Sequence, residues 1–136
     1  MSELLGALQL TGKGGNELFV YDDCLVRAAT GLLAALTGGS LSQLLEKLDD
    51  DVAPEVMVMR HEDNRMVRRK DVREASLTKG RWPSTGLRRL TLTLHSGTVV
   101  TYDWPGDSAT RALNHDDYAA ELLTRSLGEL LDVRLT

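Results

Sequence analysis

The sequence has 136 residues and a formal net charge of -4, and 42% of its residues are hydrophobic while 26% are charged. This length and composition are typical of one domain that folds without disulfide bonds or a structural metal, and no apolar stretch reaches the ~20 residues of a membrane-spanning helix. The acidic balance and the 4% aromatic content argue against a surface that binds nucleic acid non-specifically or stacks exposed bases.

The N-terminus and the cysteine content indicate the cellular compartment. Residues 1–6 do not combine a basic start with a long apolar stretch, so no secretory signal is predicted. Cys24 is the single cysteine and cannot form an internal disulfide bond. Both features favour a cytoplasmic protein, while export together with a partner stays open.

The segment 17–28 predicts a β-hairpin with a two-residue turn at its centre. Such a turn pairs Phe19 with Val26 and Tyr21 with Cys24. These four side chains then share one face, as expected of an antiparallel sheet that is buried on one side.

The middle of the chain predicts a mixture of helix and strand. An apolar segment bounded by glycines, called the island below, is expected to form a short helix or turn that packs on the domain. A helix with a serine N-cap follows it. In chain order, the predicted elements are the island at 30–39, the helix at 40–49, a strand at 55–60, a strand in the later part of 66–78, and a loop at 79–86.

The clearest hairpin follows that loop. A two-residue turn would place apolar and polar side chains on the same face. A three-residue loop with Gly97 in the left-handed conformation instead pairs Leu92 with Val100 and Leu90 with Tyr102, which keeps one face apolar. The three-residue loop is therefore predicted.

An amphipathic helix is predicted at the C-terminus. Asn114 can cap its first turn, and Asp116 and Asp117 suit the positive end of the helix dipole. The apolar stripe of this helix consists of Tyr118, Leu122, Leu123, Leu127, Leu130 and Leu131.

Few residues suit catalysis. Cys24 with a histidine would make a small thiol-dependent enzyme, which is the least favoured function, because a cysteine on an apolar face is usually a buried small hydrophobe. His61, His95 and His115 each lie at a predicted turn or cap. No metal site and no cofactor are predicted: the acidic residues after His115 point to different sides of a helix, and the glycine-rich segment 12–15 lacks the spacing of a phosphate-binding loop.

Two groups of basic residues suggest an anion site for phospholipid headgroups or nucleic acid. The alternative interpretation is a solvated charged face balanced by nearby acidic residues. The candidate anion-binding residues are Arg68, Arg69 and Lys70 in the first group, flanked by Arg65 and Arg73, and Lys79, Arg81, Arg88 and Arg89 in the second.

A protein partner or a second copy of the chain is the favoured ligand. Arg81 and Trp82 lie together in a loop, and arginine and tryptophan dominate binding hot spots. Leu32, Leu33 and Leu36 would add an apolar contact patch if the island is exposed, whereas burial within the domain is the alternative. These features predict a non-catalytic protein-binding or self-assembly module.

The order of elements resembles the bacterial pleckstrin-homology-like (PH-like) domains over residues 16–133, within one domain spanning 1–136. The segments that carry the resemblance are 17–23, 70–77, 90–102 and the terminal helix. The resemblance implies an α+β fold in which a bent antiparallel β-sheet, or partly open barrel, is covered at one end by the C-terminal amphipathic helix. It also implies a ligand-binding or assembly module without catalytic residues. The inserted helical segment at about 31–50 departs from this pattern.

Overall fold

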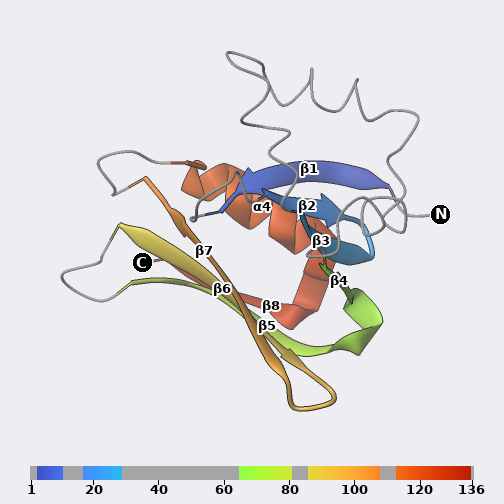
Figure 1. Ribbon diagram of the computed structural model, residues 1–136. Coiled ribbons are helices and arrows are strands. Elements are labelled where there is room, and N and C mark those ends of the chain that lie inside the picture. The colour runs from blue at the N-terminus through green and yellow to red at the C-terminus, as the bar shows by residue number, and fades with distance from the viewer. Residues whose placement is uncertain (1–2, 11–16, 29–64, 81–85, 108–112, 136) are drawn as a thin grey trace.

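The computed structural model describes residues 3–10, 17–28, 65–80, 86–107 and 113–135, drawn in colour in Figure 1. The inserted helical segment and the strand predicted at 55–60 lie outside the described residues. The described part consists mostly of strands, together with one α-helix, and is of mixed α+β class.

The first sheet, sheet A, is an antiparallel meander of four strands in the order β1-β2-β3-β4. Its strands are β1 (Leu4–Gln9), β2 (Glu17–Tyr21), β3 (Cys24–Ala28) and β4 (Arg65–Arg68). Strand β1 was not expected from the sequence, because its short and mainly apolar run, LLGALQ, shows no alternation of apolar and polar residues.

The second sheet, sheet B, has four strands in the order β7-β6-β5-β8. Its strands are β5 (Val72–Lys79), β6 (Leu87–Leu94), β7 (Val99–Pro105) and β8 (Leu131–Arg134). Strand β8 runs parallel to β5, whereas the other pairs are antiparallel. The described strands thus form two sheets instead of one bent sheet, and they close no barrel.

The hairpin of β6 and β7 has the predicted register. Leu92 pairs with Val100 and Leu90 with Tyr102, so the apolar side chains share one face. Gly97 has a φ angle of 92°, in the left-handed region that a side chain disfavours. The prediction of a three-residue loop is confirmed.

The hairpin of β2 and β3 also has the predicted pairing of Phe19 with Val26. The expectation of a sheet buried on one side was wrong, because every residue of β2 is buried. Leu18, Val20 and Leu25 point into the main core, while Phe19 and Val26 on the opposite face are buried as well.

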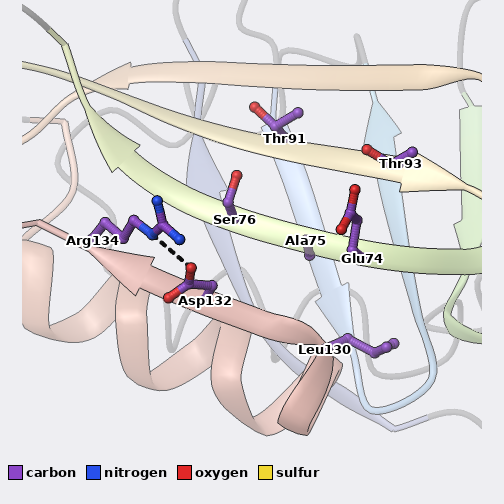
Figure 2. A pocket seen from close by; sticks show the side chains of 8 residues that line it. All are labelled: Glu74, Ala75, Ser76, Thr91, Thr93, Leu130, Asp132 and Arg134. Atoms are coloured by element: carbon purple, nitrogen blue, oxygen red, sulfur yellow. Dashed lines mark hydrogen bonds and ion pairs between the residues drawn. The ribbon is translucent and has the colours of Figure 1, made fainter.

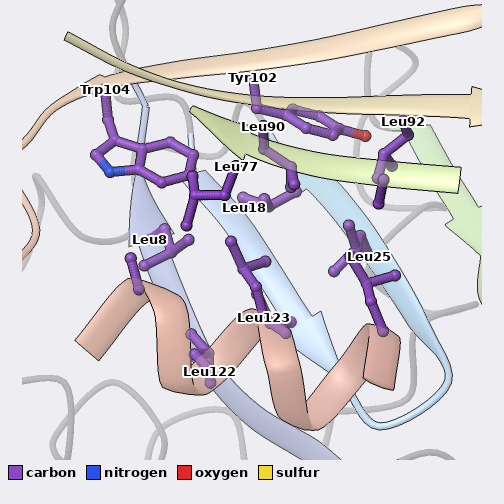
Figure 3. Close-up of a cluster of buried hydrophobic side chains, with 14 of the residues drawn as sticks. Leu8, Leu18, Leu25, Leu77, Leu90, Leu92, Tyr102, Trp104, Leu122 and Leu123 are labelled. Atoms are coloured by element: carbon purple, nitrogen blue, oxygen red, sulfur yellow. The ribbon is translucent and has the colours of Figure 1, made fainter. Parts of the chain in front are cut away.

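Helix α4 (Asp116–Leu127) lies between the two sheets, as Figure 1 shows, and packs against β1, β2 and β8. Leu122 and Leu123 enter a core that sheet A lines with residues such as Leu18, and sheet B with Leu77 and Trp104 (Figure 3). Burial in this core raises the pKa of the Tyr102 hydroxyl to about 12, so that this tyrosine stays neutral.

Gly6 allows α4 to approach β1 closely. A Cβ atom at this position would lie 2.6 Å from the Tyr118 hydroxyl oxygen and 2.9 Å from Leu122 Cδ1. The Tyr118 hydroxyl also donates a hydrogen bond to the carbonyl of Ala7, at 3.4 Å. Strand β1 therefore contacts the helix through its backbone.

Asn114 does not cap the helix, contrary to the prediction. His115 is the N-cap residue, and it makes no side-chain capping hydrogen bond. The Asn114 side chain instead bonds the backbone of Gln9: the Gln9 N–H donates to Oδ1 at 3.1 Å, and Nδ2 donates to the Gln9 carbonyl at 2.9 Å. It thereby satisfies two groups that the end of an edge strand would leave unpaired.

The residues of the predicted C-terminal apolar stripe do pack against the core, but the α-helix ends before the last two of them. Gly128 ends α4 with a φ angle of 59°, and its N–H donates to the Thr124 carbonyl. Leu130 consequently lies in the short 3₁₀-helix η2 (Gly128–Leu130), and Leu131 begins β8.

A buried ion pair joins α4 to sheet B. The Arg88 guanidinium donates from Nε and Nη2 to the two carboxylate oxygens of Asp116, both at 2.9 Å. The exposed fractions of the two side chains are 3% and 19%. A Cβ atom at Gly106 would lie 2.5 Å from both Arg88 Nε and Asp116 Oδ1, so a glycine makes room for the pair.

The contact between β1 and α4 predicts the effect of a single methyl group. Replacing Gly6 with alanine is expected to destabilise the protein by about 1–3 kcal/mol, because the methyl group overlaps Tyr118 and Leu122. Urea unfolding monitored by circular dichroism measures this change. The double variant G6A/Y118F removes the nearest atom and should regain part of the loss, whereas an unchanged unfolding midpoint for G6A would contradict the close approach.

The ion pair predicts a stability that depends on pH. Hydrogen bonding from Arg88 lowers the pKa of the Asp116 carboxyl below its ordinary value, so the pair stabilises the fold above that ordinary value and is lost in acid. Replacing Asp116 with asparagine should cost about 3 kcal/mol near neutral pH, because Arg88 stays buried. The difference in unfolding free energy between wild type and D116N should shrink as the pH falls through the ordinary pKa range of an aspartate, below about pH 4.

The matched control for this measurement is D117N. Asp117 is the next residue and is exposed. If D117N changes the pH profile as much as D116N does, the dependence arises from the helix terminus in general and not from the pair with Arg88.

Candidate functional site

The chain crosses from sheet A to sheet B at a short 3₁₀-helix, η1 (Arg69–Asp71). The Arg69 N–H donates to the carbonyl of Asp23 in sheet A's β2–β3 turn, at 2.8 Å. The Asp71 carbonyl accepts from the N–H of His95 in the β6–β7 turn, at 2.9 Å. Both ends of η1 are thus attached to hairpin turns, one from each sheet.

A pocket of about 540 Å³ lies at this crossing. Three successive basic side chains line it, and apolar and acidic residues complete its wall. The lining residues are Asp23, Arg68, Arg69, Lys70, Val72 and Leu130. We refer to it below as the basic pocket.

Arg69 is positioned by the end of α4. A Cβ atom at Gly128 would lie 2.9 Å from Arg69 Nη2, so the guanidinium rests against the glycine backbone. A cation is favoured at the C-terminal end of a helix, where the dipole is negative. Gly128 therefore both ends the helix and leaves space for the arginine that lines the pocket.

The lining of the basic pocket combines a net positive charge with apolar surface. Asp23 is the one carboxylate in its lining, against the three basic residues Arg68 to Lys70, and Val72 and Leu130 supply apolar surface. Arg69 and Lys70 are exposed. This combination suits a ligand that carries a negative charge beside an apolar group.

The two basic groups predicted from the sequence are not brought together. The residues Arg68 to Lys70 precede β5 and Lys79 ends it, and since β5 has eight residues these positions are ~25 Å apart at the usual rise of a strand. Arg88 is buried in its pair with Asp116. Arg89 lies on the outer face of sheet B and donates to both carboxylate oxygens of Asp103, at 2.7 and 3.0 Å.

A second pocket, of about 410 Å³, lies on the outer face of sheet B, with β8 along one side (Figure 2). Its charged residues carry both signs: Glu74 and Asp132 are acidic, and Arg134 donates to Asp132 at 2.6 Å. Hydroxyl groups of Ser76, Thr91 and Thr93 make up the remaining polar lining. With two carboxylates and one guanidinium, the lining carries a net negative charge and does not favour an anion.

The remaining candidates from the sequence have mixed outcomes. Cys24 is buried in β3, with 1% of its surface exposed. His95 is exposed in a turn, and His115 Nδ1 lies 3.2 Å from Asp107 Oδ1. Within the described ranges, no group of three or more His, Cys, Asp or Glu side chains is placed to hold a metal ion. The candidate partner-binding residues Leu32, Leu33, Leu36, Arg81 and Trp82 lie outside the described residues, as does His61.

Half of the basic pocket was not expected from the sequence. Asp23 was assigned only to a turn, Leu130 only to a helical stripe, and Val72 only to a strand. No local pattern links these three positions, because they meet only when the β2–β3 turn, the start of β5 and the end of α4 converge.

Comparisons with known proteins found no matching family model, no matching curated protein and no matching solved structure. In the part of the chain that the structure describes, no helix is long and apolar enough to cross a membrane. The geometry of the basic pocket is therefore the basis for a functional proposal.

The burial of Cys24 predicts its reactivity. In the native protein its thiol should react with a maleimide at least ~100-fold more slowly than in the denatured chain, because the reagent reaches it only through opening of the sheet. Mass spectrometry of timed samples measures both rates. Rapid labelling of the native protein would revive the thiol-enzyme hypothesis.

Proposed function

We propose that the protein is a non-catalytic binding module whose basic pocket takes an acidic segment of a protein partner. The observation that carries this proposal is the convergence of Arg68, Arg69 and Lys70 on one hollow at the crossing between the sheets. The size of the hollow lies within the range usual for ligand pockets, roughly 300–1,000 Å³.

The composition of the pocket favours a peptide over a polyanion. A membrane surface or a nucleic acid presents many closely spaced phosphates. Asp23 in the lining and the net charge of -4 would both repel such a dense array of negative charge. A peptide with alternating acidic and apolar side chains could pair its carboxylates with Arg69 and Lys70 while contacting Val72 and Leu130. Anionic lipid or nucleic acid remains the second candidate and is an outcome of the test below.

The PH-like resemblance is compatible with this proposal. Among the described residues, the hairpin β2–β3, further antiparallel strands, the long hairpin β6–β7 and the packed helix α4 follow in the order on which the resemblance rests. The inserted segment at about 31–50 lies outside the described residues. The parallel strand β8 after α4 is an addition to that order. A role in binding or assembly without catalytic groups is what the resemblance implies.

Fluorescence anisotropy with a labelled peptide of alternating Glu and Leu tests the proposal. Neutralising two pocket cations in the double variant R69Q/K70Q should weaken binding at least ~10-fold, and added salt should weaken the wild type in the same direction. Glutamine avoids placing a negative charge against the C-terminal end of α4, so the helix should be preserved.

The control is R125Q, which removes one exposed cation on α4, outside the basic pocket. Its affinity for the peptide should equal that of the wild type. Equal losses in R125Q and R69Q/K70Q would mean that net charge alone attracts the peptide. Tighter binding to single-stranded DNA or phosphatidylserine vesicles than to the peptide would favour the second candidate instead.

A further inference from the structure

Leu130 lines both of the larger pockets described above. It belongs to the wall of the basic pocket at η1, and also to the wall of the pocket of about 410 Å³ on the outer face of sheet B, called the outer pocket below. Its side chain is partly buried, in the short η2 helix that precedes β8. The two pockets therefore adjoin across one apolar residue, and a single extended ligand has access to both.

A β-bulge in β5 lies where the two pockets meet. The pairing advances from Val72 to Glu74 on β5 while it moves by a single residue on β6, so Arg73 is the extra residue. In a regular strand Val72 and Glu74 would share a face. Instead Val72 is buried beside the basic pocket, and Glu74 lies on the outer face with Ser76 (Figure 2). Such bulges are common next to active sites, where they redirect a side chain.

The charge of the lining changes sign across Leu130. The basic pocket has three cations and one carboxylate, whereas the outer pocket has two carboxylates and one guanidinium. Of these, Arg134 and Asp132 form a neutral pair at 2.6 Å. The Glu74 carboxylate lies 3.7 Å from the Arg73 guanidinium, which is too long for a hydrogen bond, and its side chain is 69% exposed. Glu74 is therefore accessible to a cation from a ligand.

Hydroxyl groups accompany the Glu74 carboxylate in the outer pocket. Thr93 is its partner across the β5–β6 pair, and Thr91 and Ser76 lie farther along the same two strands. All three hydroxyl side chains are partly exposed. A hydroxyl oxygen accepts a hydrogen bond from an ammonium or guanidinium group, and its proton can be donated to a peptide carbonyl. The outer pocket thus suits a basic side chain carried by a peptide.

We propose that the acidic segment of the partner continues into a basic residue, so that its carboxylates lie in the basic pocket and a lysine or arginine lies in the outer pocket beside Glu74. The inference rests on the proposed function, because it extends the same peptide across Leu130. Four residue steps separate Val72 from Ser76 on β5, or ~13 Å at the usual rise of a strand. An extended peptide has the same rise, so the basic residue follows about four residues after the last acidic one.

Fluorescence anisotropy with three labelled peptides tests the inference. The first peptide is the alternating Glu and Leu sequence with four serines added at each end. In the second and third peptides, the outermost serine at one end or at the other is replaced with lysine. Lysine at one of the two ends should tighten binding ~3- to 5-fold, the size expected of one accessible ion pair. Lysine at the other end should have no effect, because that end points away from the outer pocket.

The variant E74Q removes the accessible carboxylate without changing the shape of the side chain. It should abolish the gain from lysine and leave the affinity for the serine peptide unchanged. The matched control is E121Q, which removes an exposed carboxylate on α4, outside both pockets, and should keep the gain. R69Q/K70Q should weaken all three peptides by the same factor, because it acts on their acidic part.

The outcomes separate this inference from the proposed function. Equal gains with lysine at either end, or a gain that E74Q retains, would mean that the net charge of -4 attracts the lysine, and either result overturns the inference. The absence of any gain also overturns it. In each of these cases the proposed function stands if the serine peptide binds the wild type and R69Q/K70Q weakens that binding. If none of the three peptides binds, both proposals fail.

Discussion

Helix α4 fills the space between two sheets that are not continuous with each other. Leu122, Leu123 and Leu127 are buried there, and burying a leucine side chain contributes about 2 kcal/mol. The helix can occupy this place because Gly6 lets it lie against the backbone of β1. The Arg88–Asp116 pair then attaches the start of the helix to sheet B, and the Ser126 hydroxyl donates to the Tyr21 carbonyl of sheet A.

The position of α4 also determines the candidate site. Its last turn ends at Gly128, where the positive φ angle redirects the chain and the missing side chain leaves room for Arg69. Leu130 then contributes to the basic pocket, and β8 continues from it along β5. The packing of the core is thus connected through a single glycine to the arginine that we propose binds an acidic partner. The basic pocket depends on charge and therefore on ionic strength, and it lies at η1 where sheets A and B meet.

The sequence alone determined the local features of the described part. Alternation of apolar residues and turn chemistry predicted both hairpins, including the left-handed Gly97, because these depend on neighbours in the chain. The same holds for the apolar stripe of the last helix and for the basic run Arg68 to Lys70. Only the tertiary structure decided which of these features meet. The Asn114 side chain hydrogen-bonds β1 instead of capping its own helix, Arg88 is buried in an ion pair with Asp116, and β8 pairs with β5. Each of these three interactions joins segments far apart in the sequence, and no periodicity of the sequence encodes such a contact.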